Sequence, residues 1–145
     1  MQKHYTSLLL VFGLWLGLTL GCSGFRKAMD EKRTEREGPG ITISAEELYK
    51  AYQSSEAEAD KLYQGKIVIV TGTVGMTSTP DSGMGRPAVI LVDANQKSIV
   101  NCFGFSPDAR DAVSKLKRGE KVTVKGKCMG RIATNEPTLE DSVLQ

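Results

Sequence analysis

Histidine and tryptophan are nearly absent from this sequence of 145 residues: His4 and Trp15 are the only ones, and both lie near the N-terminus. Beyond them the chain has no side chain whose ordinary pKa lies near neutrality, no Ser-His or Cys-His nucleophile and no imidazole ligand for a metal. We therefore expect that the protein is not an enzyme, that it has no catalytic residues, and that it holds no cofactor and no metal.

A strong excess of charge of one sign is also missing, because 19 Lys and Arg residues face 17 Asp and Glu residues, giving a net charge of +2. Domains that attract nucleic acid without regard to sequence are usually markedly basic. The length fits one globular domain with a further segment attached.

The N-terminal segment is typical of an export signal. Lys3 precedes a run of 13 uncharged, mostly apolar residues, Leu8 to Leu20, which is shorter than the ~20 residues of a transmembrane helix. The run ends in Gly21-Cys22, which resembles a bacterial lipobox. We therefore predict cleavage before Cys22, a lipid (palmitate) on Cys22, and a lipoprotein anchored in the bacterial cell envelope, facing the periplasm or the exterior. An uncleaved single-pass anchor and an ordinary secretory signal remain as alternatives.

The remaining chain divides into a linker and a domain. Residues 22–40 mix both signs of charge, have few apolar side chains and end in Gly38-Pro39-Gly40, a composition that predicts a flexible linker. The domain follows at 41–145. It begins with an amphipathic helix predicted over 44–63, because Ser44 and Glu47 form a capping box and apolar residues recur at three- and four-residue spacing.

The pattern then changes to that of strands, predicted over 66–76, 88–92, 98–105, 120–132 and 138–145. Ser106-Pro107-Asp108 starts a helix between the third and fourth of them. Gly72 and Gly75 interrupt the long first strand and indicate a bulge or a bend. The order β-β-β-α-β-β predicts a mainly β domain, a five-stranded OB-fold barrel preceded by one helix. A small sandwich usually has about seven strands and no helix at that place.

Several segments resemble the tRNA_anti-like family of bacterial OB-fold proteins. They are Tyr63-Gln64-Gly65-Lys66 with Val70-Thr71-Gly72-Thr73-Val74, then Val100-Asn101-Cys102-Phe103, and Leu116 to Cys128. The resemblance extends over about Ile41 to Gln145 and implies the fold and an exported or lipid-anchored protein. It implies no catalytic residue set.

Cys102 and Cys128 are the cysteines that remain once Cys22 is lipidated. An exported compartment permits a disulfide between them, provided that their Cα atoms approach to ~4.4 to 6.8 Å. The alternative is two buried free thiols that act as small apolar side chains.

A ligand surface is expected on the second and third barrel strands and on the loops that join strands one to two and four to five, where OB-folds bind oligonucleotides or sugars. The loop of residues 78–86 matches neither a P-loop nor an EF-hand. The candidate ligand-binding residues are Arg86, Lys97, Asn101, Phe103, Phe105, Lys125, Lys127 and Arg131.

The sequence as a whole predicts a non-catalytic, lipid-anchored binding or interaction module whose ligand is unknown. Its partners are the membrane, through the lipid, and an envelope protein or polymer, while nucleic acid is not expected. Two alternatives remain: a structural subunit that docks on an envelope protein, and binding of an oligosaccharide or single-stranded nucleic acid through the strand two to three face.

Overall fold

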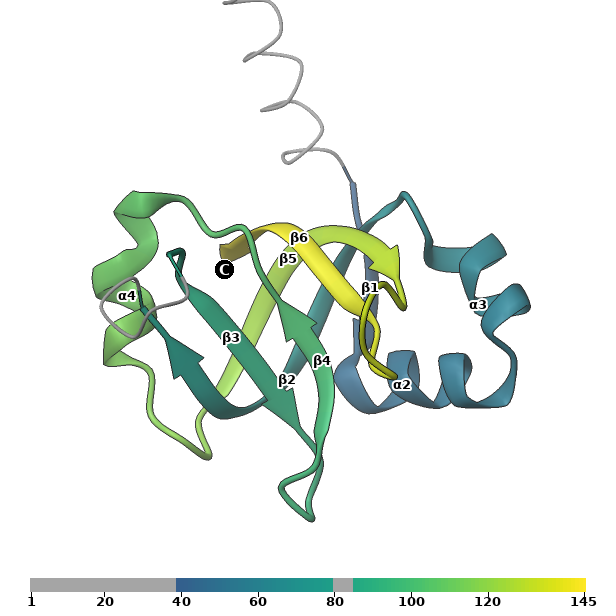
Figure 1. Cartoon of the computed structure of the whole chain (residues 1–145), viewed down its shortest axis with the longest axis horizontal. Coiled ribbons are helices and arrows are strands. Elements are labelled where there is room, and N and C mark those ends of the chain that lie inside the picture. The colour runs from purple at the N-terminus through teal and green to yellow at the C-terminus, as the bar shows by residue number, and fades with distance from the viewer. Residues whose placement is uncertain (1–38, 80–84) are drawn as a thin grey trace, which may run out of the picture.

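The computed structural model describes residues 39–79 and 85–145. These residues form one sheet with short helices at its two sides (Figure 1). The predicted signal segment, Cys22 and nearly all of the predicted linker lie outside the described residues. The elements are β1 (Ile41–Ser44), α2 (Ala45–Ser54), α3 (Glu56–Tyr63), β2 (Ile67–Ser78), β3 (Ala88–Val92), β4 (Ser98–Cys102), a 3-10 turn (Pro107–Ala109), α4 (Arg110–Lys115), β5 (Lys121–Gly130) and β6 (Thr138–Leu144).

Five of the strands close into a ring with the order β2-β3-β4-β6-β5, since β5 also pairs with β2. All neighbours in the ring are antiparallel except β4 and β6, which are parallel and join Asn101 to Thr138 and Cys102 to Leu139. This is the arrangement of an OB-fold, so the predicted fold class and the predicted position of α4 are confirmed.

The sheet has one strand that was not predicted, β1, which lies outside the ring. It runs parallel to the first half of β2 and pairs Ile41 with Val68 and Ser44 with Thr71. β3 pairs with the second half of β2, from Thr73 to Ser78. β1 therefore occupies the length of β2 that β3 leaves unpaired.

The single helix predicted over 44–63 is wrong: the segment forms α2 and α3, with a break at Ser55. The Ser44 capping box is present, as expected. Ser55, however, is extended at φ −161°, and its hydroxyl accepts a hydrogen bond from the Glu58 amide at 3.4 Å. Ser55 thus acts as a second N-cap, because a serine hydroxyl competes with the helical backbone for its amides.

The core fills the ring with the inward faces of its strands, where Val68, Val70, Leu91, Val100 and Leu139 are fully buried. Helices α2 and α3 lie at one side of the ring and α4 at the other (Figure 1). α2 contributes Leu48 and Tyr52 to the core, and α4 contributes Val113; the further buried apolar residues are Ala45, Ala59, Val74, Val89, Ile99, Cys102, Phe105, Val124 and Cys128.

Two glycines allow β2 to bend and to pack closely against its neighbours. The register with β3 shifts between Val74 and Met76, which places a bulge at Gly75, as the sequence predicted. A Cβ atom on Gly72 would lie 2.8 Å from the Cβ of Ala45 and 3.0 Å from Cδ1 of Leu91. Gly72 therefore lets the start of α2 approach the strand closely.

Replacing Gly72 with valine should lower the free energy of unfolding by about 1 to 3 kcal/mol, because the added side chain overpacks the contact with Ala45. Urea unfolding of the full chain measures the change. Thr73→Val, on the neighbouring position of the same strand, is the control and should unfold within about 0.5 kcal/mol of the parent. A G72V variant as stable as the parent would contradict this description of the contact.

Candidate functional site

A pocket of about 500 Å³ lies where the start of β3, the end of β4 and the middle of β6 meet. It belongs to the strand face on which OB-folds bind their ligands. Its lining residues come from three separate parts of the chain and are Gly85, Arg86, Ala88, Phe103, Gly104, Glu140 and Asp141.

The backbone around Gly104 shapes this pocket. The Phe103 amide donates to the Leu139 carbonyl at 2.8 Å, and the Ser142 amide donates to the Phe103 carbonyl at 3.1 Å. Gly104 and Asp141 both have left-handed backbones, at φ +71° and +51°. A Cβ atom on Gly104 would lie 2.7 Å from the Asp141 amide nitrogen, so no other residue fits there without moving β6.

The charges of the pocket are mixed. Arg86 and Glu140 are exposed lining residues of opposite charge, and Asp141 is half-buried. Phe103, also half-buried, adds an aromatic ring to the lining. One exposed cation beside an exposed carboxylate gives a polyanion little net attraction, whereas hydroxyl groups and an apolar ligand face find partners here.

Two further candidates have internal partners. Lys97 lies 5.3 Å above the Tyr49 ring centroid, and its Nζ donates to the Tyr49 hydroxyl at 2.8 Å, a hydrogen bond that raises the pKa of Lys97. Asn101 is 6% exposed; its Nδ2 donates to Thr134 Oγ1 at 3.1 Å, and its Oδ1 accepts from Ser98 Oγ at 3.3 Å. Asn101 therefore ties β4 to the loop between β5 and β6.

The remaining candidates lie elsewhere. Lys125 and Lys127 point outward from β5, which lies between β2 and β6, and they pair in register with Ile69 and Ile67. Phe105 is 2% exposed and belongs to the core. The structure therefore brings together only Arg86 and Phe103 of the predicted ligand-binding set, and it separates the lysines from them.

Arg131 packs beneath the two N-terminal helices. Its guanidinium carbon lies 5.8 Å from the centroid of the Tyr52 ring, and its Nη1 lies 3.8 Å from a carboxylate oxygen of Glu56. The Tyr52 hydroxyl donates to Asp60 Oδ1 at 3.0 Å and lies 3.5 Å from Cys128 Sγ. Burial first, and then the contact with Cys128, raises the pKa of Tyr52. These contacts hold α2 and α3 against the end of β5.

The two cysteines are free, buried thiols in this structure. Both are in register with Leu139, Cys102 from β4 and Cys128 from β5, so β6 runs between them. Two strand spacings of ~4.8 Å separate their Cα atoms by roughly 9 to 10 Å, which is beyond the reach of a disulfide. The structure therefore favours the alternative of free thiols over the bridge.

Sequence reasoning missed Gly104, Glu140 and Asp141. Their meeting depends on the parallel pairing of β4 with β6, which joins residues almost 40 positions apart and leaves no local pattern. Within the described ranges, no group of three or more His, Cys, Asp or Glu residues could hold a metal ion. In that same part of the chain, no helix has both the length and the apolar character needed to cross a membrane.

Both thiols should resist alkylation in the native protein, because burial raises the pKa of Cys102 and of Cys128 and keeps them protonated. Iodoacetamide at pH 8 should modify neither residue until urea is added, and intact-mass spectrometry should find no two-proton gain on reduction. A gain of two protons would establish the bridge and contradict the register across β6.

The comparisons with known proteins agree with this architecture. The tRNA_anti-like family model matches residues 4–143. Among curated proteins, none matches the sequence. Of the solved structures, a "putative nucleic acid-binding lipoprotein" from Klebsiella pneumoniae subsp. pneumoniae MGH 78578 is similar in fold, with a TM-score of 0.57 and 20% identity over 80% of this chain and 96% of that one.

A second solved structure, "OBody AM1L10 bound to hen egg-white lysozyme", has a TM-score of 0.40 and 23% identity over 62% of this chain and 89% of that one. The name of the Klebsiella protein does not favour the expectation that the partners do not include nucleic acid. Because the family model matches nearly the whole length, this chain belongs to the tRNA_anti-like family of OB-fold proteins.

Proposed function

We propose that the protein is a non-catalytic binding module, held at a membrane of the bacterial cell envelope by a lipid on Cys22, which takes its ligand at the pocket between Arg86 and Phe103. The observation that carries the proposal is this pocket of about 500 Å³ on the ligand face of an OB-fold. The lack of histidine after residue 4 supports the non-catalytic part.

The lipid anchor is supported by the apolar run that ends in Gly21-Cys22, and by the Klebsiella protein of similar fold, which is called a lipoprotein. The anchor keeps the domain close to the membrane, so the effective concentration of a ligand at that membrane is high. Even weak binding is then sufficient.

The ligand that best fits the pocket is an uncharged oligosaccharide of the envelope. The Phe103 ring offers an apolar face to a sugar ring, while Arg86 and Glu140 offer a donor group and an acceptor group to its hydroxyls. Single-stranded nucleic acid is the second candidate, favoured by the name of the Klebsiella protein. The exposed carboxylate of Glu140 opposes it, since nucleic acid presents a negative charge at each phosphate.

Replacing Cys22 with serine should release the protein from membranes, because a serine cannot accept the thioether-linked lipid and no lipid then holds the cleaved chain. Fractionation and intact-mass spectrometry measure the release and the loss of acyl chains. Ser23→Ala, one residue further on, is the control and should remain anchored. Membrane retention of the C22S variant would contradict the lipid anchor and favour an uncleaved anchor.

Replacing Phe103 with alanine should weaken ligand binding about tenfold or more, as expected for an aromatic side chain at the centre of a site. Fluorescence anisotropy with labelled chito-oligosaccharide and labelled oligothymidylate measures both candidates. Leu62→Ala, an exposed apolar residue on α3, is the control, and F103L separates loss of the ring from loss of stability. Equal affinity of F103A and the parent for whichever probe binds would place the ligand elsewhere.

A further inference from the structure

The charge of the domain is divided between two regions, although the whole chain is nearly neutral. From Lys115 to Lys127 the sequence has six cationic residues and one carboxylate, a net charge of +5. From Ala45 to Tyr63, the segment of α2 and α3, it has five carboxylates and two lysines, a net charge of −3. Helices α3 and α4 lie at opposite sides of the ring (Figure 1), whereas Glu46 at the start of α2 lines the same pocket as Lys121.

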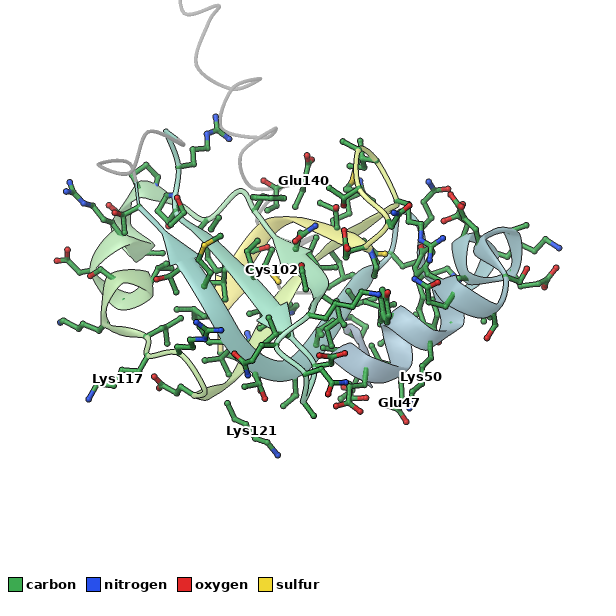
Figure 2. All side chains as sticks on the ribbon, turned by 60° about the horizontal axis from the view of Figure 1, so that its bottom comes forward. Glu47, Lys50, Cys102, Lys117, Lys121 and Glu140 are labelled. Atoms are coloured by element: carbon green, nitrogen blue, oxygen red, sulfur yellow. The ribbon has the colours of Figure 1, made fainter. Side chains whose placement is uncertain are left out.

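The strongest concentration of positive charge is the turn that joins α4 to β5, which we call the basic loop: Lys115, Lys117, Arg118 and Lys121. All four residues are exposed. Among the described residues none of them forms a salt bridge. Figure 2 shows Lys117 and Lys121 extending into solvent, on the side opposite to Glu140 of the pocket.

Hydrogen bonds hold the basic loop against β2 and the hairpin between β3 and β4, so its cationic side chains leave the domain at defined positions. The Gly119 amide donates to the Val74 carbonyl at 2.7 Å, and the Val74 amide donates to the Glu120 carbonyl at 2.8 Å. The Glu120 side chain accepts from the Lys117 amide at 2.9 Å, and Arg118 Nε donates to Gln96 Oε1 at 2.9 Å. The one carboxylate of the loop is thus engaged with backbone and not with a lysine.

We propose that the basic loop docks the domain on an anionic membrane surface, an inference that rests on the proposed lipid anchor. The negative surface potential of such a membrane attracts each Lys or Arg close to it. Each of these residues raises the ratio of docked to undocked protein about fivefold. The surface field acts on the local charges of the loop, so it orients a domain whose net charge is small.

The length of chain before the domain permits this orientation. Eighteen residues separate Cys22 from Ile41 and reach about 60 Å when extended. A domain of this size is roughly 30 to 35 Å across. The lipid and the basic loop can therefore contact one membrane at the same time, even though the chain enters the domain on the side away from the loop (Figure 1).

Nucleic acid suits the basic loop less well. Sequence-independent binding of single strands combines cations with aromatic side chains on which bases stack. No aromatic residue occurs after Phe105, and the exposed side chains of the loop and of β5 therefore offer no stacking platform. A flat charged surface, as lipid headgroups present, needs none.

Lysine acetylation of the full chain tests the proposal. The protein is reconstituted in vesicles of phosphatidylcholine alone or mixed with phosphatidylglycerol, and the rate at each lysine is followed by mass spectrometry. In the anionic vesicles we expect the acetylation rates of Lys115, Lys117 and Lys121 to fall to about one fifth or lower. High salt should restore these rates. Lys61 on α3, at the other side of the ring from α4 (Figure 1), should react equally in both. Equal rates at the three loop lysines would overturn the proposal.

A pair of variants matched in charge gives the control. K117Q/K121Q should abolish the protection of Lys115, whereas K61Q/K66Q, at the end of α3, should leave it unchanged. Protection of Lys115 in both variants would also overturn the proposal. Protection of the loop by oligothymidylate in phosphatidylcholine vesicles would assign it to nucleic acid instead. The protein is bound to vesicles in every arm, so failure here is distinct from failure of the anchor, which the release of C22S measures.

Discussion

The structure depends on one strand, β2, which has three partners. β5 pairs with one of its edges from Ile67 to Thr73, while β1 and then β3 share the other edge. The bulge at Gly75 lies within the pairing with β3, just beyond the last residue that pairs with β5, and it bends β2 there. Gly72, three residues earlier, has no side chain and so lets α2 pack closely against the same strand. Closure of the ring and attachment of the helices are thus both set within four residues.

The parts that could be predicted from sequence are those with local causes. The Ser44 capping box starts α2, Ser106-Pro107 starts the turn into α4, and alternating residues give β5. β1 has only four residues and pairs in parallel with a strand more than 25 positions away, so no local pattern marks it. The break at Ser55 was missed because the apolar spacing continues across it, while the hydroxyl of Ser55 decides the backbone.

The site was harder to predict because the face to which a residue points is a local property, but its neighbours on that face are not. Alternation along β5 places Lys125 and Lys127 outward, as expected, yet ring closure puts them beside β2 and β6 and away from Phe103. The same closure brings Gly104 against Asp141 and creates the pocket. Lys97 and Asn101, which looked like ligand contacts, are occupied by Tyr49 and Thr134.

Ring closure also determines where the charged residues lie on the surface. The net charge of +2 does not reveal how unevenly they are distributed. The cations of the basic loop and the mixed pocket belong to separate surfaces (Figure 2), while Glu46 of α2 lies near Lys121. A surface field acts on the local charges and not on their sum, so a nearly neutral domain is still oriented by it. With Lys117 and Lys121 toward the membrane, Glu140 and the pocket face away from it (Figure 2). Orientation and ligand binding therefore use opposite sides of the ring and do not compete for the same residues.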